Sequence, residues 1–192
     1  MSEWIKTGIK VIWLIVLVQW TLSAVFAKRR EGPRHALIDL LLYWLPLIVA
    51  LLLLGPGEWY GHSWLRENFV AHTDRVGMIA LAIAVAGGFV ACWSRYVLGR
   101  NWSLTVQRKQ GHQLVQHGPY SIIRHPIYTG LLLLFTGNAL IVGDYRAILA
   151  VVIVLLSFRL KIRNEETLMA ATFGAEYDTY RRRTKALVPF LL

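Results

Sequence analysis

Stretches of apolar residues constrain this chain more than any other feature of its sequence. The hydrocarbon core of a bilayer is about 30 Å thick, and a helix needs roughly 20 apolar residues to cross it. Residues 8–27, 36–54 and 76–98 each meet that length. Two shorter runs, 127–143 and 147–160, are joined by a four-residue turn and predict a helical hairpin that just spans. The chain therefore predicts an all-α, multi-pass transmembrane bundle of about five helices.

Composition supports an integral membrane protein and argues against a soluble nucleic-acid binder. Of the 192 residues 56% are hydrophobic, and 8 Trp and 8 Tyr suit two membrane–water interfaces. The formal net charge is +10, but the basic residues lie between apolar runs, so headgroups and topology explain them better. Lys28-Arg29-Arg30 follows the first run where a cleavable leader would need small residues. We expect a retained first helix and no nucleic-acid partner.

The basic residues also predict the orientation of the chain. With five crossings and the amino terminus outside, most of the 21 Lys and Arg fall on the inner side, as insertion favours. The carboxyl terminus is then cytoplasmic, and we expect a bacterial inner membrane. A model with four crossings stays open. The polar segments 99–125 and 161–192 both lie on the cytoplasmic side, and 55–74 forms an outer loop.

The string "RHPIY" places polar groups at the start of the fourth run. Pro126 suits the first residue of a helix, which makes His125 its cap. Helix amino termini attract anions and disfavour a protonated histidine, so we expect a neutral His125 that binds a carboxylate or polar ligand group. Tyr128 lies three residues on, near the same face. The alternative is an interfacial anchor in which Arg124 and Tyr128 only meet the membrane surface.

A second polar group follows the last apolar run in "RLKIRNEETL". Glu165 and Glu166 stand about one turn beyond it. The spacing allows the pairs Lys161–Glu165 and Arg163–Glu166 within one helix, which need no function. Adjacent carboxylates could also bind an amino or hydroxyl group of a ligand. No His spacing matches a metal template, and we expect no metal.

From His112 onward the chain resembles the isoprenylcysteine carboxyl methyltransferase family and its phospholipid methyltransferase relatives. The strings that carry the resemblance are "HQLVQHGPYSIIRHPIYTG" and "NEETLMAATFGAEYDTYRRRTKALVPFLL". The resemblance implies one integral membrane domain over 1–192, with transmembrane helices in 1–98 and a cofactor-binding catalytic half in 99–192. It implies a methyltransferase that uses S-adenosylmethionine and acts at the cytoplasmic membrane face on a lipophilic small molecule or a lipidated substrate.

The resemblance also implies roles for individual residues. Cofactor contacts carry over to the following positions: Gln107, His112, Gln113, Leu114, Val115, Tyr120, His125, Pro126, Ile127, Tyr128 and Glu165. The catalytic positions are His125, Tyr128, Glu165, Lys161 and Arg163. Lys161 stands where the isoprenylcysteine enzymes have Arg, and Lys lacks the planar fork that grips a carboxylate at two points. Arg163 or Arg159 could take that role.

Other functions stay open on the sequence. Methylation of a phospholipid amine would need a base, and Glu166 or a neutral His could serve. Membrane sterol reductases share a similar carboxyl-terminal pattern and use NADPH. A non-enzymatic membrane protein that keeps the scaffold is the last alternative. The acceptor and the oligomeric state are not readable from the sequence.

Overall fold

The structure is a computed structural model that describes residues 1–24, 40–99 and 113–188. The helices are α1 (Glu3–Ala24), α3 (Leu45–Leu53), α4 (Asp74–Leu98), α5 (Pro126–Val142), α6 (Tyr145–Phe173) and α7 (Ala175–Arg183). Short helical turns are η1 (Leu40–Trp44), η2 (Gly57–Tyr60), η3 (Trp64–Arg66) and η5 (Gly118–Ser121). Within these ranges the chain forms only isolated bridges and no strand. The predicted all-α helix bundle is confirmed.

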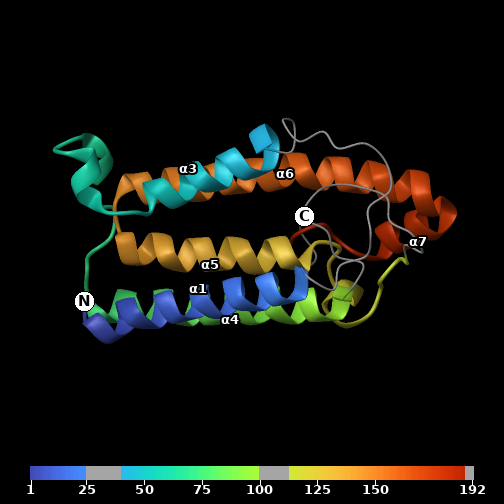
Figure 1. The fold of residues 1–192 in the computed structure, drawn as a ribbon, viewed down its shortest axis with the longest axis horizontal. Helices are drawn as coiled ribbons and strands as arrows, with labels where there is room; N and C mark the ends of the chain where they lie inside the picture. The colour runs from blue at the N-terminus through green and yellow to red at the C-terminus, as the bar shows by residue number, and fades with distance from the viewer. Residues whose placement is uncertain (25–39, 100–112, 189–192) are drawn as a thin grey trace.

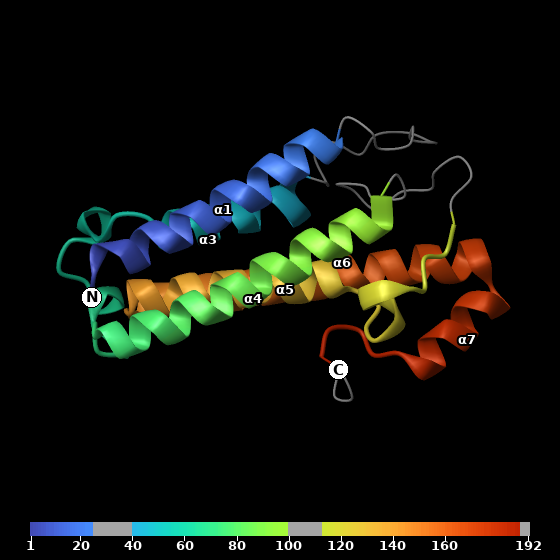
Figure 2. The ribbon, with the colours of Figure 1, turned by 90° about the horizontal axis from the view of Figure 1, so that it is seen from below.

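Helices α1, α3, α4, α5 and α6 run lengthwise through the molecule, and α7 folds back at one end (Figure 1). Helix α5 lies between the pair α3 and α6 and the pair α1 and α4 (Figure 1). The amino terminus and the turns at 54–73 and 143–144 share one end (Figures 1 and 2). The segments 113–125 and 161–188 meet at the other end (Figure 2). We call the first the loop end and the second the site end.

Apolar side chains cover the outside of the bundle as well as its core. Leu14, Leu22 and Phe89 are 60%, 63% and 64% exposed. Helices Glu3–Ser23 and Asp74–Leu98 are long and apolar enough to span a membrane, and Leu41–Leu53 and Pro126–Val142 are shorter apolar helices. Helices satisfy their own backbone groups, so such outward apolar faces suit contact with lipid. The protein is a membrane protein, as its sequence predicts.

Small residues let α4 and α5 pack with their backbones in close approach. A Cβ atom on Gly130 would lie 2.5 Å from the backbone nitrogen of Ala91, and one on Gly87 would lie 2.6 Å from the carbonyl oxygen of Gly130. Gly137 meets Ala80 in the same way at 2.6 Å. Small residues serve this purpose in membranes, where no hydrophobic effect drives helices together and close van der Waals packing has to hold them. The contact fixes the start of α5 relative to α4.

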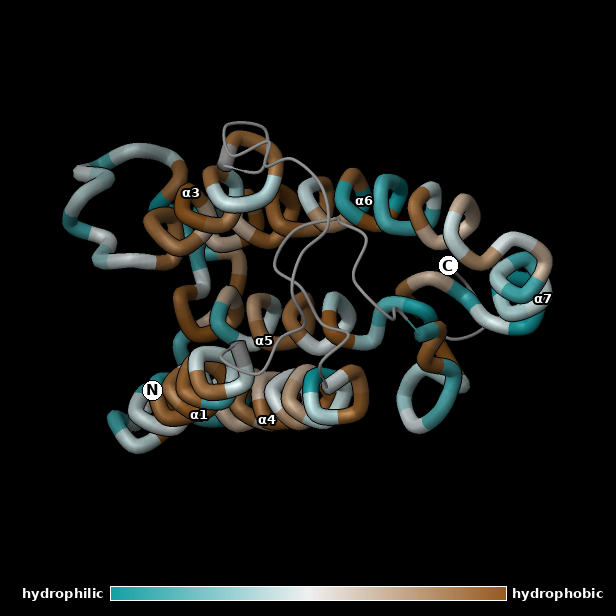
Figure 3. The backbone as a smooth tube through the Cα atoms, turned by 45° about the vertical axis from the view of Figure 1, so that its right-hand side comes forward, coloured by the Kyte–Doolittle hydropathy of each residue, from teal (hydrophilic) through white to brown (hydrophobic). Residues whose placement is uncertain are grey.

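Helix α6 is longer than its apolar run predicts. It has 29 residues and continues through the polar residues after Leu160 as far as Phe173 (Figure 3). The polar part has no Pro or Gly and is rich in Lys, Arg, Glu and Ala, which favour helix. Gly174 ends the helix with a positive φ of 52° that favours glycine. The polar side chains of 161–168 therefore stand on a rigid extension of a bundle helix.

Candidate functional site

The carboxyl-terminal segment fixes the start of α5. Pro126 is the first residue of α5 and His125 is its cap, as the sequence predicts. The backbone nitrogens of Arg124 and His125 donate to the carbonyls of Lys185 and Ala186 at 2.8 and 3.0 Å. Thr129 Oγ1 donates to Leu187 O at 2.7 Å. The residues before α5 are thus held by a distant part of the chain.

His125 lies between the two glutamates of α6. Its Nδ1 is 3.4 Å from Glu165 Oε2, and its Nε2 is 3.4 Å from Glu166 Oε1. The side chains of His125, Glu165 and Glu166 are only 9%, 23% and 14% exposed. Nε2 is not aligned with Glu166, and this buried nitrogen has no hydrogen bond to any residue that the structure describes. The three side chains form a buried, charged centre where α5 begins.

Aromatic rings and a lysine complete one side of this centre. Tyr128 Oη donates to Glu165 Oε1 at 2.6 Å, and its ring stacks on His125 with centroids 5.7 Å apart. The Lys161 ammonium lies 5.5 Å from the ring centroid of Tyr128 and 5.1 Å from that of Tyr43. Asn164 Nδ2 donates to Tyr43 Oη at 3.1 Å. A cation is therefore held between two rings beside Glu165.

Arg124 closes the other side of the centre. Its Nε donates to Glu166 Oε1 at 2.7 Å, and its Nη1 donates to the carbonyls of Thr184 and Arg181. Arg181 Nε adds a longer contact of 3.8 Å to Glu166 Oε2. Glu166 thus faces two arginines and one histidine. We call His125, Tyr128, Lys161, Glu165, Glu166 and Arg124 the charged centre.

The charged centre shifts the proton affinities of its members. Burial raises the pKa of Glu166, but the nearby His125 and the hydrogen-bonded Arg124 lower it more, to about 2. Burial lowers the pKa of His125, yet the two carboxylates raise it above its ordinary value. Glu166 is therefore ionised, and the two carboxylates shift His125 toward its protonated form.

The surroundings of these residues differ from two expectations. The sequence predicts a neutral His125 because of the helix terminus, whereas the two facing carboxylates raise its pKa. The sequence also allows solvated pairs within α6, whereas Glu166 pairs with Arg124 from another segment. Tertiary packing brings that arginine close, and the spacing along one helix cannot report it.

The structure brings together some of the predicted residues and separates others. His125, Tyr128, Lys161 and Glu165 meet, and Pro126 and Ile127 are buried behind them. Arg163 is exposed and takes no part in the contacts that hold the centre in the described part of the chain. Tyr120 is buried, and its hydroxyl donates to Ser94 O on α4 at 3.4 Å. Burial and the Glu165 carboxylate raise the pKa of this hydroxyl, so Tyr120 borders the centre.

The segment ahead of "GPY" is described only in part. Gln113, Leu114 and Val115 are extended, and the next residue, Gln116, donates to Glu176 of α7 at 3.0 Å. Gln107 and His112 lie outside the described residues. Their predicted contacts with a cofactor stay predictions.

Sequence reasoning missed two residues beside the charged centre, Tyr43 and Asn164. Tyr43 lies within an apolar run and is 6% exposed, and nothing in its neighbourhood in the sequence marks it as polar. The spacing of three between Lys161 and Asn164 is a weak sign that both face one side of α6. Only the packing of η1 on α6 shows that Tyr43 reaches them.

The chain matches a known family over more than half of its length. The family described as phospholipid methyltransferase matches residues 76–176, which include all of the charged centre. The protein-S-isoprenylcysteine O-methyltransferase of Schizosaccharomyces pombe is 28% identical over 161 residues, 78% of this chain and 67% of that protein. The cobalt-zinc-cadmium resistance protein CzcN of Cupriavidus metallidurans is 33% identical over 150 residues, 75% of this chain and 59% of that protein.

A solved structure shares the fold. The structure of the eukaryotic intramembrane Ras methyltransferase ICMT matches with a TM-score of 0.56 and 21% identity, over 82% of this chain and 54% of that one. The chain spans about three fifths to two thirds of the length of the yeast and plant relatives named as isoprenylcysteine methyltransferases.

Proposed function

Because this chain belongs to the phospholipid methyltransferase family, we propose that it is a membrane methyltransferase that uses S-adenosylmethionine and methylates the carboxylate of a lipophilic acceptor. The observation that carries the proposal is the buried charged centre, which lies inside the matched residues. The similarity to protein-S-isoprenylcysteine O-methyltransferases from yeast and plants supports a lipidated carboxylate as the acceptor class.

The residues of the charged centre fit such a cofactor. The buried Nε2 of His125 is available to a polar ligand group. Glu165 and Glu166 supply two carboxylates, which would suit the positively charged amine and sulfonium of the cofactor. When it is bound, S-adenosylmethionine supplies a methyl group that the sulfonium has already activated. His125, Tyr128 and Glu165 are the residues that we expect to hold it.

The chain itself then has to orient the reactants and exclude water. Tyr128 and Phe158, whose ring centroids are 4.8 Å apart, wall the centre on its apolar side. Lys161 presents a cation that suits the acceptor carboxylate, held between the rings of Tyr43 and Tyr128. Alignment of this kind supplies a large part of catalysis when no strong base is needed.

The same geometry favours a carboxylate over an amine as the methyl acceptor. An amine has to lose a proton before it attacks, and His125, the histidine of the charged centre, is already engaged by the two carboxylates, which raise its pKa. Glu166 is a weak base because its pKa is about 2. A carboxylate acceptor is a nucleophile without proton transfer.

The proposal includes the orientation of the protein. The site end carries Arg124, Lys161, Lys185 and the arginines of α7, so the positive-inside rule favours its placement in the cytoplasm. The cofactor would enter from water, and the acceptor would enter from the lipid. A bacterial inner membrane stays a prediction, since relatives come from both eukaryotes and bacteria.

Ligand-induced stabilisation tests the cofactor. S-adenosylmethionine well above its Kd should raise the melting temperature of the detergent-purified protein by several degrees, because a ligand that binds only the folded state stabilises it. NADPH should not. His125→Ala and Glu165→Ala should abolish the shift, whereas Glu58→Ala at the loop end should retain it. A full response in both site variants would disprove the assignment.

The labelled product tests the acceptor. Membranes incubated with methyl-labelled cofactor should yield a methyl ester, which mild base hydrolyses to volatile methanol. A base-stable label on a phospholipid amine would replace the carboxylate by the amine as acceptor. A label in neither class would refute the lipophilic acceptor.

A further inference from the structure

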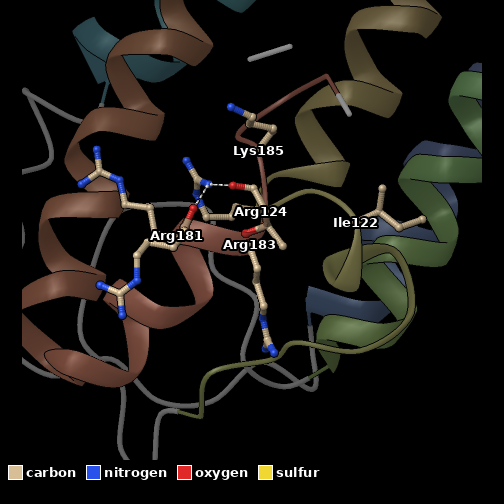
Figure 4. A pocket seen from close by; sticks show the side chains of 7 residues that line it. Ile122, Arg124, Arg181, Arg183 and Lys185 are labelled. Carbon is tan, nitrogen blue, oxygen red and sulfur yellow. Dashed lines mark hydrogen bonds between the residues drawn. The ribbon is translucent and has the colours of Figure 1, made fainter. Parts of the chain in front are cut away.

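A basic pocket lies beside the charged centre and shares Arg124 with it. It has a volume of about 250 Å³ and is lined by Ile122, Arg124, Arg181, Arg182, Arg183, Thr184 and Lys185 (Figure 4). Its lining holds five cationic side chains and no carboxylate. We propose that this pocket binds the phosphate of an anionic lipid headgroup from the adjacent leaflet.

One arginine of the pocket is built in. The Arg124 side chain is 9% exposed, and its Nε and Nη1 are fixed by Glu166 and by backbone carbonyls. The hydrogen bonds of Arg124 to described residues use Nε and Nη1 and leave Nη2 without one, and Arg124 is among the residues that line the pocket (Figure 4). A guanidinium that is held in place loses little freedom when it binds a phosphate oxygen.

The other cationic side chains around the pocket are exposed, and few carboxylates lie near enough to balance their charge. Arg181 is 58% exposed, and its nearest carboxylate, Glu166 at 3.8 Å, is already paired with Arg124. Lys185 is exposed, and its backbone carbonyl, not its side chain, accepts the hydrogen bond from the Arg124 backbone nitrogen. Arg183 donates to Gln116 and lies over the ring of Tyr180, so it stays near the pocket wall. The pocket is therefore strongly positive.

An apolar residue in the pocket lining favours a lipid over free phosphate. Ile122 lines the pocket and is 56% exposed. Exposed apolar side chains beside cations are typical of a surface that lies in the headgroup region. A free anion would gain nothing from Ile122, whereas an acyl chain would contact it.

The test measures lipid binding without any methyl transfer, so it is independent of the proposed activity. The full chain is placed in nanodiscs of phosphatidylcholine alone, or of phosphatidylcholine in which about one fifth of the lipid molecules are phosphatidylglycerol. A third sample contains phosphatidylcholine nanodiscs with added inorganic phosphate. Thermal stability should rise with phosphatidylglycerol and stay unchanged with 10 mM phosphate. The gain should shrink in high salt because the contacts are ionic.

A double variant isolates the pocket. Arg181→Gln with Lys185→Gln should weaken the response to phosphatidylglycerol about tenfold or more in lipid concentration, at roughly 1 kcal/mol for each basic residue near an anionic surface. Lys10→Gln with Arg75→Gln removes the same charge at the loop end and should leave the response intact. Melting in phosphatidylcholine checks that both proteins fold.

Three results would overturn the proposal. One is an equal loss in both double variants, which would indicate only general attraction to a charged surface. Another is stabilisation by phosphate to the same extent as by lipid, which would assign the pocket to a soluble anion. The third is no preference for phosphatidylglycerol in the unsubstituted protein.

Discussion

An arginine–carboxylate pair is buried near each end of the molecule, and each pair has one member on helix α6. The two pairs differ in what surrounds them. At the loop end Arg146 Nε donates to Asp144 Oδ2 at 2.7 Å, and Nη1 donates to the carbonyls of Leu53 and Gly55 at 2.8 and 2.6 Å. At the site end Arg124 donates to Glu166 at the same distance of 2.7 Å. Glu166 also faces His125 and Arg181.

The loop-end pair closes a structural junction. One cation meets one carboxylate, two backbone carbonyls and, at 5.3 Å, the ring of Tyr60. The site end instead gathers two carboxylates, a histidine that can titrate, a lysine between two rings and a basic pocket. A buried ion pair by itself therefore does not indicate a functional site. Several ionisable groups that share one buried environment do indicate one.

The largest expected effect is on stability at the loop end. Arg146→Met should lower the free energy of unfolding by about 3–5 kcal/mol, because it leaves Asp144 buried without its cation. Arg124→Met should cost less, since Glu166 keeps His125 and Arg181. Thermal or denaturant melting of the two purified variants measures the difference. A greater loss of stability for Arg124→Met than for Arg146→Met would show that the site-end pair, and not the loop-end pair, matters more for folding.

The next effect is on methyl transfer at the site end. Glu165→Gln keeps the shape of the side chain but removes the charge that faces His125, and we expect activity to fall about 100-fold, as misplacement within a site does. Glu58→Gln, an exposed carboxylate at the loop end, is the control and should stay within twofold. Label incorporation at saturating cofactor measures both. Equal activities would exclude the charged centre from catalysis.

A pH effect should follow from His125 alone. Since its pKa is raised on folding, the stabilisation is fully present below its ordinary value of 6.5 and is lost as pH rises through the folded-state pKa. We expect an alkaline loss of stability in the unsubstituted protein and none from this source in His125→Gln. Melting temperatures at a series of pH values measure it.

His72 is the matched control for that experiment. Its Nε2 lies 3.0 Å from Val142 O at the loop end, with no carboxylate in this contact. His72→Gln should keep the alkaline loss of stability. If the loss disappears in His72→Gln and persists in His125→Gln, the carboxylates do not hold the His125 proton.

The smallest effect concerns one hydroxyl group. Tyr128→Phe removes the 2.6 Å hydrogen bond to Glu165 while the stack on His125 stays, and a bond to a charged group is worth about 1.5–3 kcal/mol. We expect a five- to tenfold loss of activity, because Glu165 keeps His125. Tyr60→Phe, whose ring alone contacts Arg146, should change neither activity nor melting. Separate measurement of KM and kcat for the Tyr128 variant shows whether the hydrogen bond acts in substrate binding or in methyl transfer.

Part of this molecule was predictable because local sequence encodes it. The run 76–98 became α4 (Asp74–Leu98), and 127–143 became α5 (Pro126–Val142), since apolar length and Pro at a helix start act over a few residues. The run 147–160 gave only the first half of α6, because hydropathy marks the membrane part of a helix and is silent where a polar sequence continues it.

The sequence by itself determined that this is a bundle of membrane helices and, through "RHPIY" and the paired glutamates, pointed to the few residues that we propose carry its chemistry. Only the tertiary structure decided their partners. Arg124 is 42 residues from Glu166, and Tyr43 is 121 from Asn164. Contacts at such separations come from helix packing, which fixes them in space without leaving a periodic pattern in the chain. The raised pKa of His125 follows from that packing, because the carboxylates that raise it belong to α6.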